Sequence, residues 1–566
     1  MKKSILALAV SAITLQGCSS VMQATPPQLS PASSAHLSKQ CEALGQSLSY
    51  EHLTIKAVST IQSGELRLAG QDVAEHCLVI GEMYPRTSEI DGQRYAIGFE
   101  MRLPKSWNGR FLYQANGGLD GKVKTALGDT GGGPTTSALS KGFAVISSDA
   151  GHSKPLPTFG YDPQARLDYG YQAVAKLTPM AKSILQQSYG KQPDRSYFAG
   201  CSNGGRHAMV AAARYGDQYD GILVGAPGYR LPLAATASIA GAQTYASIPG
   251  TDRNNLESAF TKQERLMVTN TILKKCDALD GLEDGLVQDY RSCQTAFSLQ
   301  NDIPTCESGR DGNCLTTDQK TAIGKIFSGV TTSDGKVFYA SFPYDTGIAS
   351  DGHISWEYNA PLQRDSGAVA MIFQTPPVGL KDFNIRNFDG AKFVWQSNID
   401  DLVAKVYAIA EQYTESGMGF MAPPSPTSLD TLRDRGGKIM VYHGVSDAIF
   451  SVDDTQTWYD QLNENNQGHA NQFAQFYPIP GMGHCRGGSS TDQFDMLTPL
   501  VNWVEKGQQP EQVIASVRGK NNPGGANEEL PESFLEGLER PLCPYPTVAK
   551  YNGKGDTNLA ASFSCK

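Results

Sequence analysis

Residues 200–204 read Gly-Cys-Ser-Asn-Gly and match the pattern Gly-x-Ser-x-Gly. The apolar run Ser196-Tyr-Phe-Ala199 before them predicts a strand, and residues 207–215 after them have the apolar spacing of a helix. The two glycines would let the chain turn sharply from strand into helix, which would lift the Ser202 hydroxyl out of the sheet. This context favours a nucleophilic serine over the alternative, a plain glycine-rich turn.

Apolar runs bounded by glycine and proline predict further strands on both sides of this motif. We expect strands at residues 95–103, 109–113, 142–148, 221–224, 438–442 and 473–477, and helices at residues 167–189 and 495–505. Because strand and helix alternate, the sheet should be mostly parallel with helices on both faces, which is an α/β architecture.

The alternation is lost over residues 229–425, which contain four cysteines, an acidic loop and several glycine-rich turns. A chain of 566 residues also exceeds what one hydrophobic core usually serves. We therefore predict one discontinuous catalytic domain, residues 41–228 and 426–566, with a lid domain inserted at residues 229–425.

Two further candidates for chemistry follow Ser202 in the order Ser, Asp, His, which is the chain order of an α/β-hydrolase. Asp447 ends His443-Gly-Val-Ser-Asp447 after a predicted strand, where its carboxylate could orient an imidazole. His484 lies in the glycine-rich stretch Pro480-Gly-Met-Gly-His-Cys485, as a mobile general base would. The alternatives are a capping or turn Asp447 and a surface His484. Two later acids, Asp453 and Asp454, are weaker candidates.

Eleven cysteines are present, and ten remain when Cys18 near the start is set aside. Cys201 precedes Ser202 and Cys485 follows His484. If the two catalytic side chains meet, these neighbours could reach the Cα separation of about 4.4–6.8 Å that a disulfide tolerates. Short spacings predict three local bonds, and we also predict a bond near the start of the domain; these pairs are Cys276–Cys293, Cys306–Cys314, Cys543–Cys565 and Cys41–Cys77.

The first 18 residues are typical of a bacterial export signal. Met1-Lys2-Lys3 is basic, and the apolar stretch at residues 4–15 is too short to span a bilayer. The stretch Leu15-Gln-Gly-Cys18 resembles a lipobox, which predicts lipidation of Cys18; the alternative is that Cys18 is lost with the signal. Residues 19–40 are then expected to form a tether, with a proline- and serine-rich part after residue 24.

We expect an exported monomer of a Gram-negative bacterium, either an outer-membrane lipoprotein or a periplasmic or secreted protein. The lipid would be its sole contact with a membrane. The formal net charge is −9 and no basic run occurs, so the sequence argues against a nucleic-acid partner.

At these residues the chain resembles the tannase/feruloyl esterase family, whose hallmark is a Cys-Ser nucleophile and a His-Cys base joined by a disulfide. The resemblance covers nearly all of the mature chain. Long stretches that are similar to those of one family member occur at residues 162–168, 276–281, 433–438, 494–500 and 540–546.

The resemblance implies further site residues. The backbone amides of Gly118 and Asn203 would bind the oxyanion, and Gly118 lies in a glycine-rich loop after an early strand, as this fold requires. Phe450, Arg364 and Trp356 would contact the substrate, although Phe450 could equally be a core residue. The segment 356–375 looks shorter than in the similar family member, and Asn203 stands where that protein has glutamate.

An acidic loop in the lid, residues 277–286, lies between Cys276 and Cys293. Carboxylates interleaved with glycines suit a hard cation. The resemblance implies a structural calcium ion held by the side chains of Asp277, Asp280 and Asp284 and by the carbonyls of Leu282 and Leu286. A solvated acidic turn is the alternative.

Together these observations predict a serine ester hydrolase that works through an acyl-enzyme. The expected substrates are small esters of aromatic acids, whether feruloyl or galloyl esters or mono(2-hydroxyethyl) terephthalate. Two alternatives are a catalytically silent cell-surface binding protein and an exported serine peptidase or thioesterase, because the same triad serves acyl transfer generally.

Overall fold

The Ser202 turn stands on a nine-stranded mixed sheet. The computed structural model describes residues 26–133, 137–379 and 388–566. The strand order is β15 (Ala474–Ile479), β14 (Lys438–Gly444), β11 (Gly221–Gly225), β10 (Arg195–Cys201), β8 (Arg110–Ala115), β9 (Ala144–Ser148), β6 (Arg94–Pro104), β5 (His76–Thr87) and β2 (Leu53–Ile61). Neighbours from β15 to β9 pair in parallel, and the last three pairings are antiparallel. The prediction of a mostly parallel sheet is confirmed.

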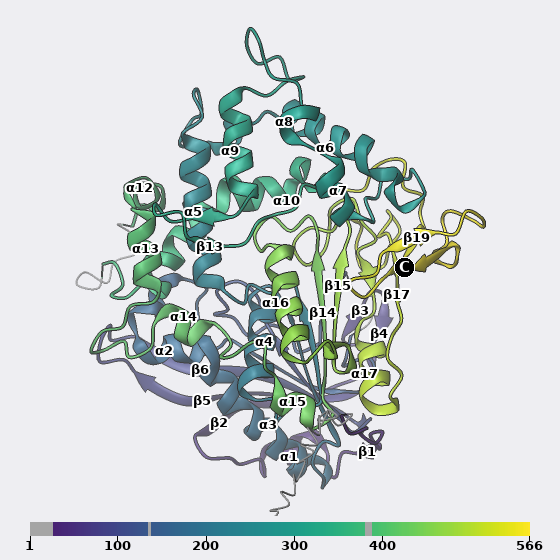
Figure 1. Cartoon of the computed structure of the whole chain (residues 1–566). Helices are drawn as coiled ribbons and strands as arrows, with labels where there is room; N and C mark the ends of the chain where they lie inside the picture. Colours follow the sequence, from purple (N-terminus) through teal and green to yellow (C-terminus); the bar gives the residue numbers. More distant parts are fainter. Residues whose placement is uncertain (1–25, 134–136, 380–387) are drawn as a thin grey trace, which may run out of the picture.

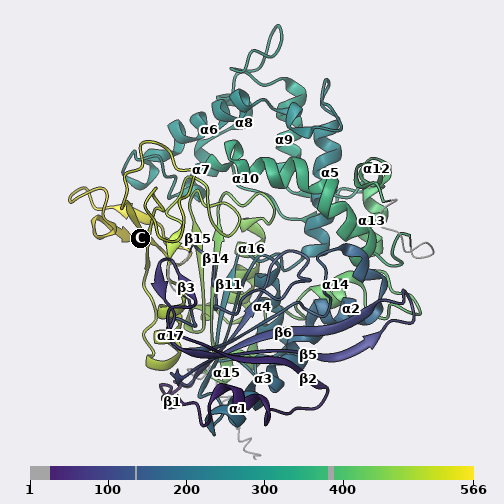
Figure 2. The ribbon, with the colours of Figure 1, turned by 180° about the vertical axis from the view of Figure 1, so that it is seen from behind.

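Helices cover both faces of this sheet (Figures 1 and 2). Phe198, Ile222 and Val441 face the core shared with α3 (Ala173–Tyr189), α4 (Asn203–Arg214) and α16 (Val452–Asn465). Their neighbours Tyr197, Leu223 and Met440 face the core under α17 (Leu497–Lys506). Strands that are buried on both faces carry continuous apolar runs, which is why these segments show no alternation with polar residues.

Helix α4 begins directly after Ser202, four residues earlier than predicted. Gly204 and Gly205 weakened the helical pattern because glycine is a poor helix former. Their role is close packing: a Cβ on Gly205 would lie 2.2 Å from the carbonyl oxygen of Gly225 in β11. The first turn of α4 can therefore press directly against the sheet.

The segment between β11 and β14 is largely helical. Most of it gathers above the carboxyl ends of the parallel strands, while its last helix, Asp430–Asp434, lies low in the view, just before the amino end of β14 (Figure 1). Its helices are α5 (Leu231–Ala246), α6 (Lys262–Cys276), α7 (Tyr290–Ala296), α8 (Leu299–Asp302), α9 (Thr317–Phe327), α10 (Asp351–His353), α11 (Ser366–Ala368), α12 (Gly390–Gln396), α13 (Ile399–Val406), α14 (Gly417–Met421) and α15 (Asp430–Asp434). Widened helical turns lie at Ile354–Asn359, Pro361–Asp365 and Val369–Phe373. A small hairpin, β12 (Val330–Thr331) and β13 (Val337–Tyr339), joins them.

The remaining elements surround the sheet. They are α1 (Cys41–Gly45), α2 (Pro163–Leu167), the pair β3 (Arg67–Leu68) and β4 (Gln71–Asp72), the sheet β16 (Gln493–Phe494), β17 (Val513–Ser516) and β18 (Glu539–Leu542), and the hairpin β19 (Ala549–Tyr551) and β20 (Phe563–Cys565). Disulfides join Cys41–Cys77, Cys276–Cys293, Cys306–Cys314 and Cys543–Cys565, as the sequence analysis expected.

Residues 32–36, within the predicted tether, are attached to the catalytic domain. Strand β1 (Ala35–His36) pairs with β7 (Ser106–Trp107), and the Ala32 amide donates to Glu505 at 2.9 Å. The predicted signal, with Cys18, lies outside the described residues. Within the described ranges, no helix is both long enough and apolar enough to cross a bilayer.

Candidate active site

Ser202 occupies a strained turn between β10 and α4. Its φ is 68°, in the left-handed region, and its amide donates to the Gly225 carbonyl at 3.0 Å. Both glycines of the motif are sterically required: a Cβ on Gly200 would lie 2.7 Å from the Gly204 carbonyl carbon, and one on Gly204 would lie 2.6 Å from the Ala115 oxygen. The turn therefore presents the Ser202 side chain beyond the end of the sheet.

The three side chains predicted as a triad form one chain of hydrogen bonds. Ser202 Oγ lies 2.8 Å from His484 Nε2, and His484 Nδ1 lies 2.7 Å from Asp447 Oδ2. Asp447 follows β14 and His484 follows β15, so neighbouring parallel strands deliver both residues to the same edge of the sheet. Since Nδ1 faces a carboxylate, Nε2 can accept the serine proton.

Asp447 is held as a carboxylate. Its Oδ1 accepts from the amides of Ile449 (3.0 Å) and Phe450 (3.1 Å). Burial by itself would raise the pKa of Asp447, but the charge of His484 and hydrogen bonds from two histidines outweigh it, and the pKa lies well below its usual range. The acid therefore stays ionised while it orients His484.

The second of these histidines, His443, had no role in the sequence analysis. Its Nε2 lies 3.2 Å from Asp447 Oδ2 and 3.0 Å from the Phe450 carbonyl, and its Nδ1 lies 2.9 Å from Thr455 Oγ1. With Nδ1 as acceptor, Nε2–H is shared between the Phe450 carbonyl and Asp447 Oδ2. The side chain is fully buried. Its place four residues before the acid was visible in the sequence, but its contact with that acid depends on the fold.

A disulfide joins the residues beside the nucleophile and the base. Cys201 and Cys485 are bonded, with a Cα separation of 6.1 Å, as predicted from their neighbours. The bond links the end of β10 to the loop after β15. Because β10 and β15 are not neighbours in the sheet, strand pairing does not connect these two segments directly.

The two residues predicted to donate oxyanion amides, Gly118 and Asn203, lie in the loop after β8 and directly after Ser202. Gly118, with φ 67°, is in the loop after β8 and lines the same cavity as Ser202. Asn203 is the first residue of α4, so its N–H has no carbonyl partner in the helix. Gly117 lies close to the nucleophile: a Cβ built on it would lie 3.5 Å from Ser202 Cβ.

A cavity of about 460 Å³ opens over Ser202 and His484. Its wall includes Trp356 and Arg364 from the lid, together with Lys124 and Arg486 from the catalytic domain. The Trp356 ring packs edge-on against His484, with centroids 5.2 Å apart. Arg364 lies over that ring at 4.6 Å and donates to Asp365 through Nε (2.7 Å) and Nη2 (2.5 Å).

Phe450 is buried beside the base. Its ring lies edge-on to His484, with centroids 5.3 Å apart, and does not line the cavity. The structure thus brings Trp356 and Arg364 to the site, while Phe450 supports the imidazole.

The carboxylates of the acidic loop accept hydrogen bonds from backbone amides of the same loop. Asp277 accepts from the amides of Asp284 (3.1 Å) and Gly285 (2.9 Å), and Asp280 accepts from Leu282 (3.0 Å). Burial, with the nearby charges of Asp284 and Asp277, raises the pKa of Asp280 to about 7. Its Oδ2 is buried without a hydrogen-bond partner.

The C-terminal segment supplies cations to this loop. Arg540 pairs with Asp284, and Lys550 donates to the Leu279 carbonyl at 2.8 Å and to Asp289 at 2.7 Å. In the part of the chain that the structure describes, no three side chains of His, Cys, Asp or Glu are grouped to hold a metal ion. Any cation here would therefore need backbone carbonyls as ligands.

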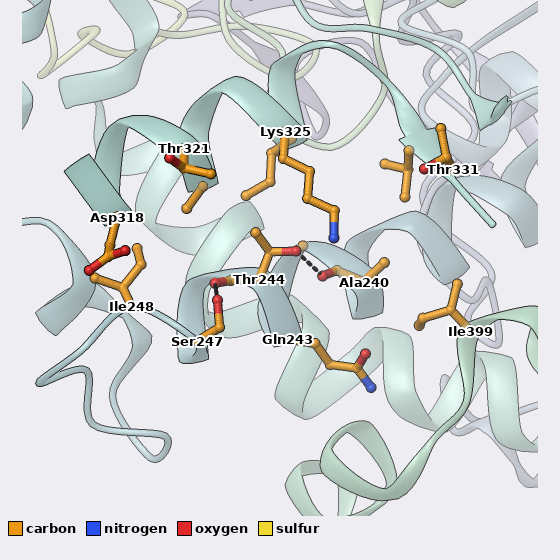
Figure 3. Close-up of a pocket in the computed structure, with 14 residues that line it drawn as sticks. Ala240, Gln243, Thr244, Ser247, Ile248, Asp318, Thr321, Lys325, Thr331 and Ile399 are labelled. Atoms are coloured by element: carbon orange, nitrogen blue, oxygen red, sulfur yellow. Dashed lines mark hydrogen bonds between the residues drawn. The ribbon is translucent and has the colours of Figure 1, made fainter. Parts of the chain in front are cut away.

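A second cavity, of about 400 Å³, lies within the lid between α5 and α9 (Figure 3). Lys325 of α9 points across it toward Ala240 and Thr244 of α5. None of its lining residues belongs to the hydrogen-bonded triad or to the predicted metal loop. At about 460 Å³, the cavity over Ser202 is the larger of the two.

Known proteins resemble this chain over most of its length. The family described as "Tannase and feruloyl esterase" matches residues 77–566. The mono(2-hydroxyethyl) terephthalate hydrolase of Piscinibacter sakaiensis is 38% identical over 531 residues, which cover 87% of this chain and 85% of that protein. A probable feruloyl esterase B-1 of Neosartorya fischeri is 27% identical over 498 residues, 82% of each protein.

Solved structures share the fold. Feruloyl esterase B from Aspergillus oryzae aligns with a TM-score of 0.73 at 23% identity and covers 93% of this chain and 99% of that one. Tannin acyl hydrolase from Aspergillus niger aligns with a TM-score of 0.66 at 17% identity and covers 94% and 96%. These matches confirm the predicted α/β-hydrolase fold and the resemblance seen in the sequence. The chain belongs to the tannase and feruloyl esterase family and is a carboxylic ester hydrolase.

Proposed function

We propose that the chain hydrolyses esters of aromatic carboxylic acids through a serine acyl-enzyme. The observation that carries this proposal is the continuous hydrogen-bonded chain Ser202–His484–Asp447, with distances of 2.8 and 2.7 Å. A hydroxyl in contact with an imidazole, which is itself oriented by a buried carboxylate, is the arrangement that nucleophilic catalysis requires.

The steps follow from this geometry. His484 Nε2 removes the proton from Ser202 Oγ as that oxygen attacks the ester carbonyl. The amides of Gly118 and Asn203 stabilise the negative oxygen of the tetrahedral intermediate. His484 then gives its proton to the departing alcohol. Water, activated by the same imidazole, attacks the acyl-enzyme and releases the acid.

An aromatic acyl group fits the walls of the cavity. Trp356 supplies an aromatic face directly beside His484, and Arg364 adds a cation above that face. The names of the relatives point the same way, since one hydrolyses mono(2-hydroxyethyl) terephthalate and another is a probable feruloyl esterase. Feruloyl, galloyl and hydroxyethyl terephthalate esters are therefore the substrates of choice for a first test.

We also propose that the enzyme is an exported monomer, anchored to the outer membrane through a lipid on Cys18. Five disulfides support export, because such bonds persist in oxidising compartments. The basic and apolar start of the chain, followed by Leu15-Gln-Gly-Cys18, supports the signal and the lipid.

A structural calcium ion in the lid is a third proposal. The side chains of Asp277, Asp280 and Asp284, which the structure does not group as a metal site, would close around the ion together with the carbonyls of Leu282 and Leu286. The unpartnered buried oxygen of Asp280 and its raised pKa support a cation, which would relieve the repulsion among these carboxylates. The ion would stabilise the lid and take no part in the chemistry.

The test uses the purified enzyme with methyl ferulate, methyl gallate, mono(2-hydroxyethyl) terephthalate and the matching anilides. We expect ester hydrolysis with little amide hydrolysis. Ser202→Ala should lower kcat by about 10³-fold or more with an unchanged circular dichroism spectrum. Labelling of Ser202 by a fluorophosphonate would support the nucleophile. Near-normal turnover by Ser202→Ala, or amides cleaved faster than esters, would contradict the proposal.

A further inference from the structure

We infer that Asp120 is a positioning residue for the oxyanion hole. Its carboxylate joins the turn that carries Gly118 to the first turn of α4, which carries Asn203. This inference rests on the proposed serine mechanism and adds a residue that the sequence analysis did not select.

Asp120 is tied to both oxyanion segments. Its amide donates to the Gly117 carbonyl at 3.3 Å, which closes a turn around Gly118. Its Oδ2 accepts from Asn203 Nδ2 at 2.9 Å and lies 3.0 Å from His207 Nε2. One buried carboxylate oxygen therefore holds two side chains of α4 against the loop after β8.

His207 packs between Asp120 and Arg206. Burial lowers the pKa of His207 well below its usual value, so its ring is neutral. Arg206 Nη2 lies 3.1 Å from His207 Nδ1 and 3.0 Å from His207 Nε2, and Nε2 also lies 3.0 Å from Asp120 Oδ2.

A second path of hydrogen bonds connects Asn203 to Gly118 through Arg206 and Tyr169. Arg206 Nε donates to Asn203 Oδ1 at 2.6 Å, and Arg206 Nη2 donates to the Tyr169 carbonyl at 3.0 Å. The Tyr169 hydroxyl then donates to the Gly118 carbonyl at 3.1 Å. Gly118 and Asn203 are connected twice, through Asp120 and through Arg206 with Tyr169.

The backbone conformation of Asp120 is unfavourable by itself and needs surrounding contacts to maintain it. Its φ is 52°, a left-handed conformation that costs a non-glycine residue on the order of 1 kcal/mol. The side chain is 2% exposed, so the hydrogen bonds that compensate for this conformation are shielded from water. Strained backbone that surrounding contacts maintain is typical of functional sites.

Changing Asp120 should affect the stabilisation of the transition state more than substrate binding. Two amides stabilise the oxyanion only if their separation and direction are correct, and losing one such donor costs about 10²–10³-fold in kcat. Loosening Asp120 should displace the donors without removing them. We therefore expect kcat to fall by roughly 10–100-fold in Asp120→Ala while KM changes little. Asp120→Asn keeps an acceptor oxygen of the same shape and should restore most of the activity.

Asn203→Ala tests the same link and leaves in place the carboxyl group of Asp120, whose pKa burial raises well above its usual value. Its backbone amide remains, so a purely catalytic role of that amide predicts no loss, whereas the link to Asp120 predicts a lower kcat. In the double variant Asp120→Ala/Asn203→Ala, the effects on kcat should be less than additive, because each single change already breaks the same Asp120–Asn203 contact.

Glu505→Gln is the matched control. Glu505 is equally buried and accepts from Arg110 and Tyr197 near the opposite ends of the strands. Its loss should lower the melting temperature and leave kcat unchanged. If the melting temperature falls in all three variants but kcat falls only in the Asp120 and Asn203 variants, lower stability does not explain the loss of kcat.

The experiment measures kcat, KM and the Ki of phenylboronic acid, which forms a tetrahedral adduct with the serine. Support requires that Ki rises in step with the loss of kcat/KM. Wild-type kcat and Ki in Asn203→Ala and in a folded Asp120→Ala would overturn the inference. If Ser202→Ala is inactive in that same experiment, the serine mechanism stands and this inference alone fails.

Discussion

Cys201 and Cys485 lie 284 residues apart in the chain, yet a disulfide joins them with a Cα separation of 6.1 Å. Each is the covalent neighbour of one partner in the Ser202–His484 hydrogen bond. The bond closes a short covalent path between the turn of the nucleophile and the loop of the base. His484 lies in a loop with four glycines nearby, Gly481, Gly483, Gly487 and Gly488, so this path restricts a segment that would otherwise be pliable.

Removing this disulfide should therefore reduce both stability and catalysis. The double variant Cys201→Ala/Cys485→Ala should lose about 2–5 kcal/mol of unfolding free energy, and kcat should fall at least roughly tenfold. Thermal unfolding and methyl ferulate hydrolysis measure the two effects. The control is Cys306→Ala/Cys314→Ala, which removes a bond with a sequence separation of 8 within the lid. Equal losses of kcat in both double variants would refute a specific role in positioning the base.

Asp447 should prove to be the acid of the triad, in preference to the nearby carboxylates. Asp447→Asn should lower kcat by about 10³–10⁴-fold, because the amide would favour the wrong tautomer of His484. Asp453 accepts from Ser341 at 2.7 Å and, among the residues that the structure describes, makes no hydrogen bond or ion pair with His484, so Asp453→Asn serves as the control. Steady-state kinetics of the two variants shows which of the two carboxylates is the acid of the triad. A severe loss of kcat in the Asp453 variant with retention in the Asp447 variant would reverse the assignment.

Calcium should stabilise the lid more strongly at higher pH. The pKa of Asp280 is raised to about 7, so without a cation the stability from its bound proton is present at low pH and is lost as pH rises from about 4 through 7. Calcium replaces that proton and removes this loss. At a hundredfold excess over its Kd, calcium adds about 2.7 kcal/mol.

Melting curves in EDTA and in calcium chloride, near pH 5 and near pH 8, test this expectation. The gain in melting temperature should be larger at the higher pH and should disappear in Asp280→Asn. The exposed Asp252→Asn is a control outside the loop. Equal gains at both pH values, or a gain that survives in the Asp280 variant, would count against calcium in this loop.

Arg364 should affect substrates that carry a free carboxylate more than those that do not. Its guanidinium lies over Trp356 but already donates twice to Asp365, so part of its charge is neutralised. We expect Arg364→Ala to raise KM for mono(2-hydroxyethyl) terephthalate by about 10-fold, equivalent to about 1.4 kcal/mol, and KM for methyl gallate by much less. Arg364→Lys keeps the charge and should recover part of the difference. Equal changes for both esters would exclude a contact with the acid.

Several parts of this protein were determined by local sequence. The Gly-x-Ser-x-Gly turn follows from steric limits on five consecutive residues, since a Cβ at Gly200 or Gly204 would collide with backbone. The pairing of Cys201 with Cys485 followed because covalent neighbours of two touching residues are themselves close. The two-sided burial of the parallel strands was visible as unbroken apolar runs at residues 221–224 and 438–442.

Other parts were decided by tertiary structure alone. Asp120 meets Asn203 across 83 residues, and Asp284 meets Arg540 across 256 residues. No periodicity or spacing records such contacts, because they depend on how strands and loops are brought together. The start of α4 was misjudged for a related reason: Gly204 and Gly205 lower helix propensity locally, while their value lies in the close approach of α4 to β11 and β8. Sequence therefore identified the reacting groups, and packing between distant segments selected the residues that hold them in place.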